Sequence, residues 1–192
     1  MITMDINKKG IRVLAIAESF REGTSNSVLS GVVMRKDLVV DGVVFGNTTI
    51  EGDDATENII SLYKSLHRND INFLLLDGLI ISMYNIIDGN LIHENIRIPI
   101  IAISFNDSQG IENSIKKHFP FNYNDKLKNL RRLGRRDLVV LKTNKDLWIR
   151  FWGINLEDSI KLLNSFLLQG AVPEPIKLAK IISHAYIYRS IQ

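Results

Sequence analysis

Asn72-Phe73-Leu74-Leu75-Leu76-Asp77-Gly78 is the most informative segment of the chain. Its apolar residues do not alternate with polar ones, which is typical of a short strand covered by helices on both faces. Asp77 ends this strand, and in α/β sheets ligands gather at the carboxyl ends of the parallel strands. Gly78 would let another group approach closely. Asp77 is therefore the first candidate for a functional residue.

Periodic segments on both sides of this run define the fold class. The sequence predicts further strands at 10–17, 28–34, 38–50 and 98–103, a strand pair at 138–142 and 148–151, and helices at 54–67, 108–118, 156–168 and 174–188. The first three strands are consecutive and antiparallel, and a crossover must join the strand that ends at Asp77 to the one at 98–103. This order predicts a ribonuclease H-like α/β fold, a mixed sheet flanked by helices, in a single domain spanning 1–192.

Composition excludes several classes of protein. The 192 residues are 45% hydrophobic and 23% charged, as in ordinary globular proteins. The absence of cysteine rules out disulfides, zinc-thiolate sites, iron-sulfur clusters and cysteine nucleophiles. The longest apolar stretch, 71–87, is interrupted by Asp77, Gly78 and Asn85, and the first ten residues are polar. We therefore expect a soluble, unprocessed cytoplasmic protein.

Carboxylates near predicted strand ends indicate a metal site. Glu18 follows the first strand, which should neighbour the Asp77 strand, and Asp54 and Glu57 begin the helix after the third strand. Carboxylate oxygens that converge at one edge of a sheet would suit Mg²⁺ or Mn²⁺. A structural interpretation stays open, because Asp54 and Glu57 also fit a helix capping box and Asp77 could end its strand through an Asx-turn.

Positive charge is concentrated in one segment, which we call the basic strip. Residues 126–150 contain nine basic and two acidic side chains, whereas residues 1–125 contain 11 basic and 16 acidic ones. Such a strip could follow the phosphates of DNA or RNA. The candidates for nucleic-acid binding are Arg131, Arg132, Arg135, Arg136 and Lys142. The alternative is that the strip is an exposed, partly helical connector.

Motifs along nearly the whole chain resemble a mainly archaeal family, domain-of-unknown-function family ninety-nine, which is related to endonuclease V. They are Gly10-Ile11-Arg12-Val13-Leu14, Gly31-Val32-Val33-Met34, Gly52-Asp53-Asp54-Ala55-Thr56-Glu57, Leu76-Asp77-Gly78, Tyr84-Asn85-Ile86-Ile87-Asp88, Lys117-His118-Phe119-Pro120 and Pro173-Glu174-Pro175-Ile176-Lys177-Leu178-Ala179. The resemblance implies a ribonuclease H-like fold. For endonuclease V it implies magnesium-dependent cleavage of nucleic acid near a deaminated adenine.

The chain departs from endonuclease V at positions that the resemblance makes important. Where endonuclease V has a metal-binding Asp at the end of its first strand, this chain has Ala17, and Glu18 comes one place later. A shift of one residue in a strand reverses the face to which a side chain points. Glu18 could replace the Asp only if the strand ends or bulges before it. The Pro-Tyr-Ile-Pro-Gly wedge of endonuclease V is absent from 48–54, and Lys180 stands where the C-terminal motif continues with His.

Two hypotheses follow for the function. In the first, Asp77, Glu18 and Glu57, with Asp54 as a second possibility for the helix carboxylate, form a catalytic site in which Mg²⁺ or Mn²⁺ supports phosphodiester hydrolysis of DNA or RNA. In the second, the chain is a catalytically inactive ribonuclease H-like module that binds nucleic acid or a protein partner through the basic strip. Ala17 motivates the second hypothesis.

Overall fold

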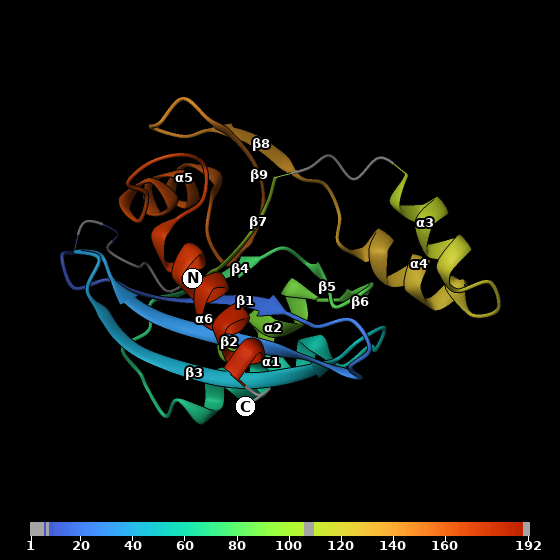
Figure 1. Cartoon of the computed structure of the whole chain (residues 1–192). Coiled ribbons are helices and arrows are strands. Elements are labelled where there is room, and N and C mark those ends of the chain that lie inside the picture. Colours follow the sequence, from blue (N-terminus) through green and yellow to red (C-terminus); the bar gives the residue numbers. More distant parts are fainter. Residues whose placement is uncertain (1–5, 7, 106–109, 190–192) are drawn as a thin grey trace.

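A mixed seven-stranded sheet forms the centre of the computed structural model, which describes residues 6, 8–105 and 110–189 (Figure 1). The strand order is β3-β2-β1-β4-β7-β9-β8. The strands are β1 (Arg12–Ser19), β2 (Asn26–Arg35), β3 (Val40–Thr49), β4 (Phe73–Asp77), β7 (Ile100–Ser104), β8 (Asp137–Val140) and β9 (Asp146–Trp152). The short strands β5 (Ile80–Ile81) and β6 (Asn85–Ile86) form a separate hairpin.

Strand directions confirm the expected mixed sheet. Strands β1, β2 and β3 are antiparallel neighbours, whereas β4 runs parallel to β1 and β7 runs parallel to β4. Strands β8 and β9 form the expected antiparallel pair beyond β7. The carboxyl ends of β1, β4 and β7 therefore lie at the same edge of the sheet.

Helices cover both faces of the sheet. This covering is needed because successive side chains of a strand point to opposite faces, and both sets are apolar in the central strands. They are α1 (Ala55–Ser65), α2 (Gly89–Ile96), α3 (Ile111–His118), α4 (Tyr123–Arg132), α5 (Leu156–Ser165) and α6 (Glu174–Arg189). In β1, Leu14 and Ile16 pack in a cluster with residues of α1 and α2, whereas Ala15 and Ala17 pack in a second cluster with residues of α5 and α6. Figure 1 shows α6 crossing one face of β1 and β2, with α1 and α2 on the opposite face.

The first strand begins and ends two residues later than the sequence predicts, at Arg12–Ser19 instead of 10–17. Strand β1 continues through Glu18 to Ser19, and both residues pair in regular register with β2. The strand therefore neither ends nor bulges before Glu18, and Glu18 follows Ile16 on the α1 side. The expected helix at 108–118 begins at Ile111 in the described residues, and Ser108 lies outside them.

Helices α3 and α4 form a hairpin that projects from the rest of the molecule (Figure 1). A small cluster of Ile115, Phe119 and Leu127 joins the two helices. Lys126, only 3% exposed, anchors the hairpin to the loop after β3. Its Nζ donates to the carbonyl oxygens of residues 51 and 52 and to Asp53 Oδ1 at 2.7 Å. One cation of the basic strip is therefore structural.

No described helix combines the length and the apolar character needed to cross a membrane.

Candidate active site

Glu18 and Asp77 lie at the carboxyl ends of the adjacent strands β1 and β4. The parallel register ends with the pair Ile16 and Leu76, so Asp77 lies at the level of Ala17. Alternation places Asp77 and Ala17 on the α6 side of the sheet and Glu18 on the α1 side. Both carboxylates nevertheless line one small cavity of about 10 Å³ at the end of the sheet, which is room for about one water-sized group.

The carboxylate of Glu18 is only half satisfied. Its Oε1 accepts a hydrogen bond from the backbone N–H of Ser82 at 3.0 Å. Its Oε2 is buried and accepts no hydrogen bond from the residues that the structure describes. Burial is the largest influence on Glu18 and raises its pKa; the Ser82 N–H lowers the pKa, the charge of Asp77 raises it and the nearby Ser27 side chain lowers it, with a net rise. A buried carboxylate oxygen without a donor is unusual and indicates a site prepared for another group.

The residue that binds Glu18 belongs to a strained turn. Ser82, Met83 and Tyr84 join β5 to β6 with φ values of 44°, 57° and 73°, so three consecutive residues other than glycine are left-handed. This conformation is costly for each of them and persists only where the surroundings impose it. Gly78 has a φ of 94°, and a Cβ there would meet no atom within 4 Å. Backbone conformation, rather than crowding by the protein, therefore favours glycine beside Asp77.

Asp77 opens on its other side into a cavity of about 430 Å³, which we call the Asp77 cavity. Three cations line it together with Asp77: Arg136, Arg150 and Lys180. The Nζ of Lys180, from α6, lies 2.8 Å from Asp77 Oδ2, and the Asp77 side chain is 14% exposed.

The two arginines of the Asp77 cavity are held in place by neighbouring residues. Arg136 stacks over Trp148, with its guanidinium carbon 4.8 Å from the ring centroid, and donates to Ser104 Oγ at 3.3 Å. Arg150 donates to the carbonyl of Gly134. Burial, helped by the charge of Arg136, lowers the pKa of Arg150 to about 10, which leaves it charged at neutral pH. The cavity is thus suited to a small anion such as a phosphate group.

Asp54 has a complete set of hydrogen bonds and differs in this from Glu18. Its carboxylate accepts from Thr48 Oγ1 at 2.6 Å, from Asn85 Nδ2 at 2.7 Å, and from the N–H and hydroxyl of Thr49. Burial acts to raise the pKa of Asp54, but the donors from Thr48, Asn85 and Thr49 outweigh it and hold the pKa well below its usual range. Asp54 ties the end of β3 to the β5–β6 hairpin.

The capping box expected at the start of α1 does not form the predicted side-chain hydrogen bond from Asp54. Asp54 occupies the N-cap position, but its side chain makes no capping hydrogen bond. The Oδ1 of Asn85 accepts from the N–H of Ala55 instead, at 3.1 Å. Glu57 is exposed in the first turn of α1. Sequence spacing cannot reveal this exchange, because Asn85 comes from a distant hairpin.

The structure brings together two of the carboxylates proposed as metal ligands. Glu18 and Asp77 line one cavity, whereas Glu57 and Asp54 do not line it. Among residues 6, 8–105 and 110–189, no group of three or more His, Asp or Glu side chains is arranged to hold a metal ion.

A family model for endonuclease dU matches residues 9–187 of the chain. The chain belongs to the endonuclease dU family. One sequence relative is a UPF0215 protein of Pyrobaculum calidifontis. It is 34% identical over 171 residues, which are 88% of this chain and 93% of the relative. A UPF0215 protein of Pyrobaculum aerophilum is 32% identical over 173 residues, 90% and 92% of the two chains.

Solved structures share the fold of this endonuclease dU family member. A protein of unknown function from Archaeoglobus fulgidus superposes with a TM-score of 0.79 at 23% identity, covering 93% of this chain and 99% of the other. Endonuclease V of Ciona intestinalis, solved with DNA that contains inosine, gives a TM-score of 0.61 at 15% identity over 95% and 87% of the two chains. The expected ribonuclease H-like fold and its likeness to the fold of endonuclease V are confirmed.

In this endonuclease dU family member the residues proposed for nucleic-acid binding are dispersed. Arg131 and Arg132 are exposed on α4, Arg135 is exposed after it, and Arg136 lines the Asp77 cavity. Lys142 lies at the β8–β9 turn, where its backbone N–H donates to Asn164.

Sequence reasoning did not select Arg150 and Lys180 for the site. In the sequence Lys180 is visible only as a departure from the family's C-terminal motif. Arg150 lies between Trp148 and Trp152, at a predicted strand. This pattern of a cation between two aromatic residues is the sequence feature that could have indicated a place in the site.

Proposed function

We propose that this protein is an endonuclease that hydrolyses a phosphodiester bond of DNA or RNA near a deaminated base. The observation that carries the proposal is the position of Asp77, with the unpartnered oxygen of Glu18 on one side and three cations in a cavity on the other. The family name and the inosine-containing DNA of the Ciona endonuclease V structure support the substrate class. Deoxyuridine and inosine are both products of base deamination.

The two carboxylates fit a divalent cation. Mg²⁺ commonly uses one or two protein carboxylates and completes its shell with water and substrate phosphate oxygens, so a third carboxylate is not required. Glu18 offers a buried oxygen without a donor, and Asp77 lines the same cavity. Glu18 and Asp77 would therefore hold Mg²⁺ or Mn²⁺. When bound, the ion supplies an activated water and neutralises charge on the phosphate.

The cations of the Asp77 cavity would bind and orient the phosphodiester. Arg136 and Arg150 present guanidinium groups, whose planar donors match phosphate oxygens. Their anchoring by Trp148 and Gly134 keeps them in position before substrate binds. Lys180 neutralises Asp77 and would turn to the phosphate once Asp77 has another cationic partner.

Cleavage assays on Asp77→Asn test this proposal. Oligonucleotides that contain deoxyuridine or inosine, as DNA and as RNA, are incubated with Mn²⁺ or Mg²⁺ and the products are separated by size. We expect the rate of cleavage to fall by about 100-fold or more, because a metal ligand is lost. Asp146→Asn, at the exposed β8–β9 turn, is the matched control and should cleave normally. Equal rates for Asp77→Asn and the original protein would reject the assignment.

A second candidate function is a non-catalytic module that binds nucleic acid. The ion pair of Lys180 with Asp77 favours it, because the lysine provides the positive charge that Asp77 would otherwise take from a metal ion. Ala17, beside Asp77 on the same face, favours it too. Calorimetric titration with Mn²⁺ separates the candidates: binding that Asp77→Ala abolishes supports the endonuclease, and the absence of binding supports the module.

A further inference from the structure

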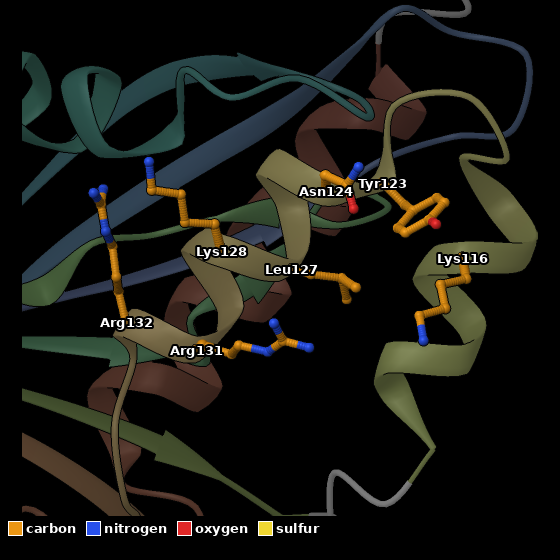
Figure 2. Close-up of a pocket in the computed structure, with 7 residues that line it drawn as sticks. All are labelled: Lys116, Tyr123, Asn124, Leu127, Lys128, Arg131 and Arg132. Atoms are coloured by element: carbon orange, nitrogen blue, oxygen red, sulfur yellow. The ribbon is translucent and has the colours of Figure 1, made fainter.

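The α3–α4 hairpin carries a second concave surface, separate from the Asp77 cavity. This surface, which we call the hairpin groove, has a volume of about 560 Å³. Figure 2 shows Leu127 and Arg131 pointing from α4 toward α3, with Lys128 and Arg132 side by side on the neighbouring face of α4. Lys116 lies on α3 across from Leu127 and Arg131, whereas Lys128 and Arg132 project from the side of α4 away from α3 (Figure 2). Four cations therefore line the hairpin groove.

Most of this charge is not neutralised within the protein. Arg131 pairs with Glu112 at 3.3 Å. Lys116, Lys128 and Arg132 are exposed and form no ion pair in the part of the chain that the structure describes. Lys128 and Arg132 are four positions apart on one helix, so the two like charges repel each other. An anionic partner would relieve this repulsion.

An exposed aromatic ring lies at the tip of the same hairpin. Phe121, in the turn between α3 and α4, is 98% exposed, whereas Phe119, two residues earlier, is 9% exposed and belongs to the hairpin core. A phenylalanine gains nothing from full exposure to water. Beside a cationic groove it is suited to stack on an unpaired base, which is a common element of single-strand binding.

We propose that the hairpin groove and Phe121 bind a single-stranded segment of the nucleic-acid substrate. Phosphates contact Lys116, Lys128 and Arg132, and an unpaired base stacks on Phe121. The same two helices supply Ile111 and Leu130 to the wall of the Asp77 cavity, so a strand leaving that cavity can continue along the hairpin. The inference rests on the proposed function for the identity of the substrate and adds a surface that holds it.

Charge reversal tests the hairpin groove. Binding of a labelled single-stranded oligodeoxynucleotide is measured by fluorescence anisotropy at several salt concentrations, without divalent ions. We expect Lys128→Glu with Arg132→Glu to weaken binding by at least about tenfold, and to reduce the slope of log K against log salt by about 1.4, since each single-strand phosphate contact contributes about 0.7. The matched control, Lys8→Glu with Lys9→Glu at two exposed positions before β1, should change affinity less than about twofold.

Phe121 is tested by a pair of substitutions that separate stacking from bulk. Phe121→Leu keeps an apolar side chain but removes the ring, and we expect it to weaken single-strand binding by about tenfold. Phe121→Trp keeps a stacking surface and should retain the affinity. Unchanged binding by Phe121→Leu would remove Phe121 from the proposal, and equal losses in both variants would assign its effect to structure rather than stacking.

The remaining outcomes separate this inference from the proposed function. Equal weakening by the groove pair and the control pair, or equally tight binding of polyglutamate, would show only attraction to net charge and overturn the inference. All binding measurements are repeated in Asp77→Asn protein. If Asp77→Asn cleaves normally while the groove pair loses binding, the proposed active site is wrong and the groove stands. If Asp77→Asn is inactive while the groove pair binds normally, the groove is wrong.

Discussion

Glu18 and Asp54 are two partly buried carboxylates near the ends of neighbouring structural elements, and their surroundings are opposite. Asp54 accepts hydrogen bonds from three residues, Thr48, Thr49 and Asn85, which lower its pKa. Glu18 accepts one, from the Ser82 N–H, and its second oxygen is buried with no donor at hydrogen-bond geometry in the described chain. Burial raises the pKa of Glu18 by more than Ser82 and Ser27 lower it.

This difference separates a structural carboxylate from one available to a ligand. Both oxygens of Asp54 already accept hydrogen bonds, so a metal ion would compete with donors that also join β3 to the β5–β6 hairpin. The protein stabilises the Glu18 carboxylate less completely than water would, and a cation would compensate. Hydrogen bonding, rather than position at a strand or helix end, therefore distinguishes the two roles.

Removing Asp54 should have the largest effect on stability. In Asp54→Ala the hydroxyl of Thr48, the N–H and hydroxyl of Thr49 and the amide of Asn85 lose their charged acceptor, and we expect the free energy of unfolding to fall by about 3 kcal/mol. Urea denaturation followed by circular dichroism measures this. Glu57→Ala, on the exposed side of the same helix, should cost less than about 1 kcal/mol. Equal losses in the two variants would contradict a structural role specific to Asp54.

Local sequence patterns predict most of the fold correctly. The apolar run that ends at Asp77 and the run at 98–103 do not alternate, and the structure covers both on two faces. The antiparallel order of the first three strands followed from their spacing. The end of β1 did not, because Glu18 and Ser19 are polar and their place in the strand depends on pairing with Leu29 and Val28 in β2.

The candidate site was only partly predictable, because long-range contacts decide it. Asp77 followed from its place after a buried strand. The sequence could not show that Asn85 caps α1 in place of Asp54, or that Lys180, more than 100 positions away, pairs with Asp77. It also could not distinguish Lys126, which is buried in the hairpin, from the exposed cations beside it.

Lys180 offers a way to sharpen the comparison, since it gives Asp77 the partner that Glu18 lacks. If Mn²⁺ binds between Glu18 and Asp77, Lys180 competes with it, and we expect Lys180→Met to raise Mn²⁺ affinity by about tenfold. Isothermal titration calorimetry measures the affinity. Lys177→Met is the matched control, because Lys177 is on the same helix and pairs with Glu174 away from the cavity. An unchanged affinity in Lys180→Met would show that the ion pair does not occupy the metal position.

The smallest effect, and the most direct contrast with Asp54, concerns the pH dependence of Glu18→Gln. The raised pKa of Glu18 means that the folded protein binds a proton more tightly than the unfolded chain does, so Glu18 reduces stability as the pH rises above about 4.5, the ordinary pKa of a glutamate. Glutamine keeps an acceptor for the Ser82 N–H and carries no charge. Glu18→Gln should therefore be as stable as the original protein or more stable at neutral pH, by less than about 1 kcal/mol, and the difference should vanish in acid.

Asp54→Asn should show the opposite sign. Because the pKa of Asp54 is lowered, its contribution to stability is complete above about pH 3.8, the ordinary pKa of an aspartate, and is lost as the pH falls through the folded pKa. Urea denaturation from acid to neutral pH measures both variants, with Glu22→Gln in the exposed β1–β2 turn as the control. If Glu18→Gln destabilises the protein more at neutral pH than in acid, then the Glu18 carboxylate has enough hydrogen-bond donors in solution. The proposal that it is available to a cation, on which the metal site depends, would then be wrong.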